Sequence, residues 1–137
     1  MVKTSADWIN LILSPKLSDN VPLEINNLFE VARGTLVYGF LFYPIYTVAA
    51  EQLFRVAETA ITLKCLALNA PQKLTFEKKL TWLNQNDILT KTETRSWHKI
   101  RKYRNASSHP DDQGMFHQVW AIDFLTYITT KINELFQ

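Results

Sequence analysis

The chain of 137 residues contains only one cysteine, three glycines and five prolines. A single cysteine excludes a disulfide within the chain and a zinc site built from several cysteines. The scarcity of glycine and proline disfavours a β fold with many turns and favours long helices. Charge of one sign is scarce as well, because the formal net charge is only +2. The composition therefore indicates no general affinity for nucleic acid, and any electrostatic argument depends on local clustering.

A long hydrophobic run is also missing. Residues 34–50 are uncharged, but Pro44, two glycines and three tyrosines interrupt them, and about 20 continuous apolar residues are needed to cross a bilayer. We interpret this stretch as two buried helix ends that meet at the proline. The N-terminus lacks the apolar core and the small-residue cleavage site of a signal peptide. We therefore expect a soluble, cytoplasmic protein that does not bind a membrane.

Motifs of several enzyme classes are absent too. The chain has no glycine-rich phosphate loop, no GxSxG elbow and no HExxH pair of metal ligands. Their absence argues against kinases, NTPases, α/β-hydrolases and zinc proteases, and we expect neither a cofactor nor a metal. Cys65 lies within an apolar, helix-patterned stretch, where we expect a small buried thiol.

The apolar residues that are present make up 47% of the chain, which is enough for the core of one domain over residues 1–137. Their spacing of three and four residues predicts α-helices. We expect an all-α antiparallel bundle of four main helices, with a short N-terminal helix and a short extra helix. The expected helices are one at 5–13, one from Pro22 to about Tyr43, one to about Ala70, one after Thr75, one after Thr90 and one from about Met115 to Phe136.

Particular residues are expected to start these helices and to face the core. Pro22 suits a first helical turn, Thr75 suits an N-cap, and Thr90 with Glu93 has the spacing of a capping box. The residues predicted to point inward are Leu28, Phe29, Ala32, Leu36 and Phe40 in the second helix, Val48, Ala49, Leu53, Val56 and Ala60 in the third, Phe76, Leu80 and Leu83 in the fourth, Trp97, Ile100 and Tyr103 in the fifth, and Phe116, Trp120, Phe124, Tyr127, Ile128 and Leu135 in the last.

The stretch "HKIRKYRNASSHP" at residues 98–110 carries the clearest chemical signal. Between Lys91 and Arg104 there are six basic residues and one acidic residue, a local excess of +5 within a chain whose net charge is +2. Basic side chains on a helix neutralise phosphates and release their counterions. We therefore expect Lys99, Arg101 and Lys102 to bind RNA.

A histidine at the end of this stretch suggests proton transfer. Arg101, Asn105 and His109 follow one another at four-residue steps, so they share one helix face. Pro110 ends the helix at or before His109, where the macrodipole favours a protonated imidazole. A histidine that exchanges protons beside an arginine that holds a phosphate is sufficient to cleave RNA without metal, with the 2′-hydroxyl as nucleophile. A solvated basic face with a helix-capping histidine is the simpler interpretation of the same residues.

The six residues "RNASSH" resemble the signature of the HEPN superfamily, in which an arginine, usually followed by a polar residue, precedes a histidine by four to six intervening positions. Here these residues are Arg104, Asn105 and His109, with four residues between the arginine and the histidine. The expected small all-α bundle is similar to HEPN proteins as well. So is the place of the motif, near the end of the penultimate main helix.

This resemblance implies a homodimer whose motif helices face each other. It implies a metal-independent endoribonuclease of a toxin–antitoxin or other defence system, with an antitoxin or a nucleotidyltransferase-like protein as a further partner. Arg104 and His109 would be the phosphate-holding and proton-transferring catalytic residues, and Asn105 their polar partner. Other HEPN domains have lost catalysis, so a non-catalytic module that binds RNA or a protein is the alternative, and a structural subunit of a larger complex is a third. The roles of His98 and His117 stay open.

Overall fold

The computed structural model describes residues 4–42, 44–107 and 118–137, and within these ranges residues 104–107 and 118–119 are described only as parts of helices. The described residues form six α-helices and no strand. The prediction of an all-α fold with four long and two short helices is thereby confirmed for this part of the chain. The helices are α1 (Ser5–Leu13), α2 (Leu23–Tyr38), α3 (Ile45–Ala67), α4 (Phe76–Gln85), α5 (Lys91–Ser107) and α6 (Gln118–Leu135).

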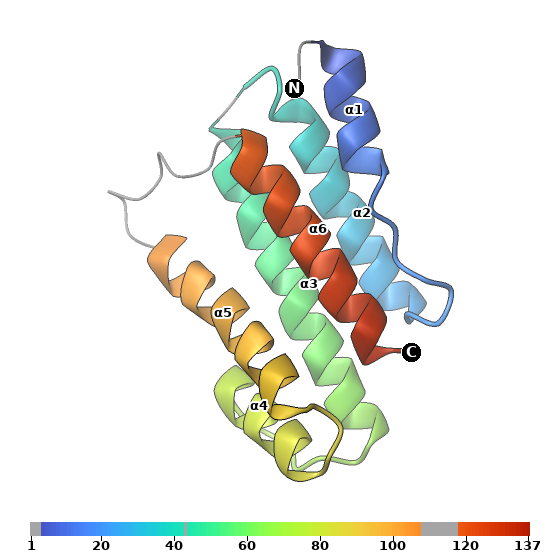
Figure 1. Ribbon diagram of the computed structural model, residues 1–137, viewed down its shortest axis with the longest axis vertical. Coiled ribbons are helices and arrows are strands. Elements are labelled where there is room, and N and C mark those ends of the chain that lie inside the picture. The colour runs from blue at the N-terminus through green and yellow to red at the C-terminus, as the bar shows by residue number, and fades with distance from the viewer. Residues whose placement is uncertain (1–3, 43, 108–117) are drawn as a thin grey trace.

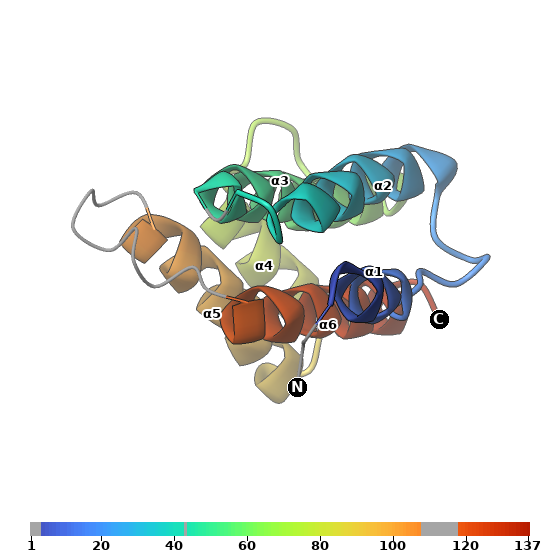
Figure 2. The same cartoon turned by 90° about the horizontal axis from the view of Figure 1, so that it is seen from above.

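The four long helices run along the long axis of the molecule in alternating directions (Figure 1). Figure 2 shows α2 and α3 in one layer and α1 and α6 in a second, with α5 beside them. The central helix is α3, because it contacts α2, α4, α5 and α6. The short helix α4 lies against α3 and α5 at the end of the molecule opposite the α2–α3 connection.

Most of the predicted inward residues are buried in one core. This core includes Phe29, Ala32 and Leu36 of α2, Ala49, Leu53, Val56 and Ala60 of α3, Leu80 and Leu83 of α4, Trp97 and Ile100 of α5, and Phe124, Ile128 and Leu135 of α6. Cys65 is buried as expected. Burial raises the pKa of its thiol, an effect that the nearby Lys79 ammonium opposes.

The predicted caps are present. The side chain of Thr75 accepts a hydrogen bond from the Lys78 amide at 3.2 Å, which satisfies one of the free N–H groups at the start of α4. At the start of α1, Thr4 and Asp7 form a further capping box, beyond the predicted ones. The bounds of α1 coincide with the predicted 5–13.

The prediction for the connection between α2 and α3 is wrong. The helix α2 ends at Tyr38 and not near Tyr43, which lies outside the described residues. The chain then turns, with the Leu41 and Phe42 amides donating to the Tyr38 carbonyl. Leu41 is 79% exposed and Phe42 63% exposed, so this segment is not a pair of buried helix ends. Leu41 and Phe42 lie five and six residues after the buried Leu36, so both are off the inner stripe of α2, and the turn leaves their side chains in solvent.

Two smaller predictions about α3 are also wrong. Val48 is 53% exposed, because the neighbouring residues Tyr46, Ala49 and Ala50 take the buried face of this turn. The helix ends at Ala67 and not near Ala70. Asn69 adopts a left-handed conformation with φ of 60°, which stops a right-handed helix and which asparagine tolerates better than most residues. The predicted start of the last helix near Met115 lies outside the described residues.

Candidate functional site

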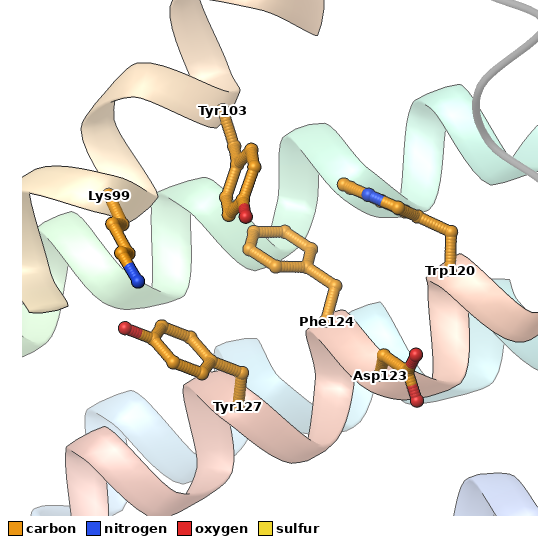
Figure 3. A pocket seen from close by; sticks show the side chains of 6 residues that line it. All are labelled: Lys99, Tyr103, Trp120, Asp123, Phe124 and Tyr127. Atoms are coloured by element: carbon orange, nitrogen blue, oxygen red, sulfur yellow. The ribbon is translucent and has the colours of Figure 1, made fainter.

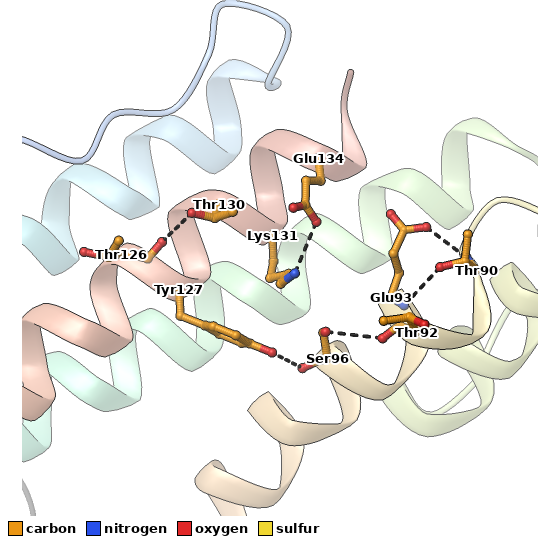
Figure 4. Close-up of polar contacts among 9 residues, drawn as sticks. All are labelled: Thr90, Thr92, Glu93, Ser96, Thr126, Tyr127, Thr130, Lys131 and Glu134. Carbon is orange, nitrogen blue, oxygen red and sulfur yellow. Dashed lines mark hydrogen bonds and ion pairs between the residues drawn. The ribbon is translucent and has the colours of Figure 1, made fainter.

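The start of α5 is fixed by reciprocal hydrogen bonds. The Thr90 amide donates to Oε1 of Glu93 at 2.9 Å, and the Glu93 amide donates to Oγ1 of Thr90 at 3.1 Å. The predicted capping box is therefore confirmed (Figure 4). Such a box satisfies two free N–H groups and fixes where α5 begins, and with it the direction in which each later side chain leaves the helix.

One flank of α5 is a row of exposed cations. Lys91, Arg95, Lys99 and Lys102 recur every three or four residues and are all exposed, so they lie on the same side of the helix. We call these four residues the basic row. Trp97 and Ile100 are buried on the opposite side, which explains why the cations face solvent.

The predicted site residues are distributed over different parts of α5. Lys99 and Lys102 belong to the basic row, whereas Arg101 is partly buried. Arg104 and Asn105 lie in the last turns of α5, but their side chains are outside the described part of the chain. His109 is outside it altogether. The roles of these three residues therefore stay predictions.

Arg101 and His98 lie on the flank of α5 that faces α4. In the described part of the chain, Nδ1 of His98 and Nε of Arg101 are buried without a hydrogen-bond partner. Burial lowers the pKa of His98, and the adjacent Arg101 and Lys102 cations lower it further, while Glu77 of α4 opposes them. The neutral imidazole is therefore favoured, and a neutral imidazole can accept a proton or a hydrogen bond.

A pocket of about 250 Å³ opens between α5 and α6. Its lining combines four aromatic rings with one cation and one carboxylate (Figure 3). Lys99 and Tyr103 extend from α5 toward α6, and aromatic side chains of α6 extend toward them. The residues that line it are Lys99, Tyr103, Trp120, Asp123, Phe124 and Tyr127.

The rings of this pocket are arranged around Phe124. The Trp120 and Phe124 ring centroids lie 4.8 Å apart with an interplanar angle of 32°. Tyr103 meets both rings edge-on, at 6.3 Å from Trp120 and 6.2 Å from Phe124. Phe124 is itself held from behind by Phe54 of α3, at 4.9 Å. These are favourable aromatic geometries. The buried Phe124, backed by Phe54, and the Trp120 ring beside it form the fixed part of the wall, and the half-exposed Tyr103 meets them edge-on.

Polar contacts join the two helices beside the pocket. The Tyr127 hydroxyl donates to the Ser96 carbonyl oxygen of α5 at 3.1 Å. Nζ of Lys131 lies 5.5 Å from the Tyr127 ring centroid and 3.3 Å from Oε2 of Glu134 (Figure 4). Tyr127 is therefore fixed at both its ring and its hydroxyl.

Sequence reasoning assigned Tyr103, Trp120, Phe124 and Tyr127 to the core and so missed the pocket. Tyr103 is 44% exposed, although it was predicted to point inward. A signal was present, because Asp123 interrupts the aromatic stripe of the last helix and Lys99 lies four residues before Tyr103. Charged residues at helical spacing from aromatic residues indicate that part of the aromatic surface is exposed to solvent.

Comparisons of this chain with protein-family models, with curated proteins and with solved structures give no match. No helix in the described ranges is long and apolar enough to span a bilayer. Among the same residues, no three histidine, cysteine, aspartate or glutamate side chains gather in a group that could hold a metal ion.

Proposed function

We propose that this chain is a metal-independent endoribonuclease of the HEPN type, with Arg104, Asn105 and His109 as its catalytic residues. The observation that carries the proposal is where the "RNASSH" stretch begins. Arg104 and Asn105 belong to the C-terminal end of α5, the penultimate helix among the described residues, which contain no strand, and α6 follows. The combination of this motif, this position and this fold class supports the assignment more strongly than six residues do alone.

The proposed reaction is a transesterification within the RNA. The 2′-hydroxyl oxygen attacks the adjacent phosphorus while the bond from phosphorus to the 5′-oxygen breaks. His109 either removes the proton of the 2′-hydroxyl as neutral imidazole or, as the imidazolium that the helix end favours, gives its proton to the leaving oxygen. The leaving oxygen takes up a proton, and the products carry a 2′,3′-cyclic phosphate and a 5′-hydroxyl. Arg104 holds the phosphate oxygens through its fork of donors. The basic row supplies the charge that draws the backbone toward α5.

The proposal extends to a homodimer. Two copies of the motif would form a composite groove, and apolar residues beside it must supply the association, because facing cations repel. Leu41 and Phe42 are exposed and belong to the α2–α3 connection, at the end of the molecule toward which the C-terminal end of α5 points (Figure 1). Light scattering at high micromolar concentration tests this, and a monomer there contradicts the composite site. Leu41→Ser should weaken association, whereas Leu23→Ser, at a similarly exposed leucine at the start of α2, should not.

The cleavage experiment uses purified protein, single-stranded RNA and EDTA. We expect cleavage to persist in EDTA and to fall by roughly 10²–10⁴ in His109→Ala, the usual contribution of general acid–base catalysis. Arg104→Ala should also abolish it. RNA with a 2′-O-methyl group at the cut site should resist, because it lacks the nucleophile. His98→Ala and His117→Ala are the comparison variants: if one of them stops cleavage while His109→Ala does not, the proton-transfer role is misassigned.

The second candidate is a non-catalytic module that binds RNA. The pocket beside the basic row favours it, because rings and cations bind single-stranded nucleic acid without any proton-transferring residue. RNA binding that is tight and sensitive to salt, with no cleavage by the folded dimer, supports this alternative. Cleavage with 2′,3′-cyclic phosphate ends excludes it.

A further inference from the structure

The pocket between α5 and α6 is built for a flat, apolar group with a polar edge. Its wall consists of Tyr103, Trp120 and Phe124, and Tyr103 is partly open to solvent. Its volume of about 250 Å³ lies below the roughly 300–1,000 Å³ of sites that hold drug-sized molecules. It therefore suits one ring system rather than a larger ligand.

The charged residues around the pocket indicate which chemical groups its ligand carries. Lys99 lines the pocket and also belongs to the basic row, so a ligand in the pocket lies next to a line of cations that attracts a polyanion. Asp123 adds a carboxylate at the α6 side, which can accept hydrogen bonds from an exocyclic amino group. A flat ring with amino groups, attached to a chain of phosphates, is a nucleobase of a single-stranded nucleic acid.

We infer that this pocket binds one unpaired base of single-stranded RNA, while the neighbouring phosphates lie along the basic row. Base stacking on aromatic side chains is a general mode of single-strand binding. The inference rests on the proposed function for its substrate class and adds a base-binding subsite to it. Tyr103 directly precedes Arg104 on α5. The residue that stacks on the base is therefore adjacent in sequence to the residue proposed to hold the cleaved phosphate.

The pocket is organised before any base arrives. Phe124 is backed by Phe54, and the Tyr127 hydroxyl is bound to the Ser96 carbonyl oxygen. Side chains that are already fixed lose little conformational freedom when a ligand binds. The α6 side of the pocket is therefore a rigid platform, and the exposed Tyr103 and Lys99 are its adjustable side.

The test measures binding and excludes cleavage. Fluorescence anisotropy follows a labelled 2′-O-methyl oligoribonucleotide, which cannot supply the nucleophile. A second oligonucleotide of equal length and charge has abasic sites in place of its bases. The proteins are the full chain, Tyr103→Leu, Trp120→Leu and Tyr103→Phe, with Trp82→Leu on α4 as the control for loss of a partly buried ring away from the pocket.

We expect Tyr103→Leu and Trp120→Leu to weaken binding of the intact oligonucleotide about 5- to 150-fold, the range for loss of one stacked base. Tyr103→Phe and Trp82→Leu should bind as the unmodified chain does. The abasic oligonucleotide should bind all proteins equally weakly. Circular dichroism and thermal melting check the fold, and Tyr103→Leu decides the question if Trp120→Leu is unfolded, because Tyr103 is half-exposed.

Three results overturn the inference. Equal losses for the intact and the abasic oligonucleotide mean that the rings do not touch a base. Unchanged affinity in Tyr103→Leu means that the pocket is not used. Unchanged RNA affinity combined with weaker self-association in light scattering means that the occupant is a protein surface.

The inference and the proposed function fail separately. If the unmodified chain cleaves RNA while Tyr103→Leu binds the oligonucleotide normally, the proposed function is supported and the base-binding pocket is refuted. If binding depends on the bases but no cleavage is found, the base-binding pocket is supported and the catalytic assignment is refuted. If the folded chain binds no RNA, both are wrong.

Discussion

The two helix pairs of this molecule are built in different ways. Helices α2 and α3 share the most extensive contact between described elements, whereas α5 and α6 touch over a much shorter stretch. Where α2 leads into α3, Gly39 lies directly against the ring of Tyr46. Between α5 and α6, large rings meet edge-on and leave a pocket. In the first pair the missing side chain of Gly39 leaves room for the Tyr46 ring, whereas the second pair encloses a pocket lined by large rings.

This difference indicates a division of roles. A closely packed pair leaves no space for a ligand and contributes to stability through dispersion and burial. A pair that is separated by aromatic side chains contributes less packing, but it exposes ring surface and polar edges to solvent. We therefore expect substitutions in the α2–α3 pair to alter folding, and substitutions between α5 and α6 to alter binding.

The largest expected effect is that of Gly39→Ala. A Cβ atom at this position would lie 2.0 Å from Cε1 of Tyr46, which is itself only 3% exposed and 5.7 Å from the Trp8 ring. Because the Tyr46 ring is buried beside the fully buried Trp8, it can give way only by shifting core residues, and we expect the free energy of unfolding to fall by about 1–3 kcal/mol, the usual cost of overpacking. Urea denaturation followed by circular dichroism measures it.

The control is Gly34→Ala. Gly34 lies inside α2, and a Cβ there meets nothing within 4 Å. Alanine has the higher helix propensity, so this variant should be more stable by about 0.5–1 kcal/mol. Equal effects of the two substitutions would contradict the role assigned to Gly39, because helix propensity alone would then explain both.

The second effect concerns α5 and α6, the pair of helices that encloses the pocket. Tyr127→Phe removes the hydroxyl that donates to the Ser96 carbonyl oxygen at 3.1 Å and keeps the ring that lines the pocket. A net hydrogen bond contributes about 0.5–1.5 kcal/mol, and we expect a loss near the lower end, because this oxygen already belongs to the backbone of α5. Urea denaturation measures the loss, with Tyr38→Phe as the exposed control that should change nothing. A Tyr38→Phe variant that is destabilised as much as Tyr127→Phe would refute the role of this hydroxyl in joining α5 to α6.

The same contrast explains what the sequence can predict. The capping signals at Thr75 and at Thr90 with Glu93 are local, because each depends on residues within one turn, and all of them are found in the structure. The apolar stripes that define the core are nearly as local. They identify buried residues such as Phe29, Leu53 and Ile128 from spacing alone.

Features that depend on contacts between two segments distant in the sequence leave no such local pattern. Gly39 gives no sign in the sequence that Tyr46 will pack against it. Pro44 predicts an end of α2 near Tyr43, five residues beyond the observed end at Tyr38. The pocket depends on how far apart α5 and α6 lie, which is a result of all the contacts of the bundle. Periodicity assigns Tyr103 and Trp120 to an inner face, but it does not tell whether a neighbouring helix covers that face.

The smallest expected effect is a dependence of stability on pH that originates at His98. Burial lowers its pKa in the folded state, Arg101 and Lys102 lower it further, and Glu77 opposes them. The unfolded chain has an ordinary histidine pKa of about 6.5. Below that value the unfolded state binds more protons than the folded state, so the contribution of the neutral imidazole to stability is complete above about pH 6.5 and declines as the pH falls toward the folded pKa.

We therefore expect the unmodified chain to lose more stability than His98→Gln when the pH is lowered from about 7.5 to about 5.5, with urea denaturation at each pH as the measurement. Carboxylates and the other two histidines titrate in both proteins, so the difference between the two curves isolates His98. Glu77→Gln sharpens the test: without the opposing carboxylate the pKa of His98 should fall further, and the loss at low pH should grow. Parallel curves for the unmodified chain and His98→Gln would show that His98 is solvated like a surface residue and that the flank of α5 facing α4 does not bury it.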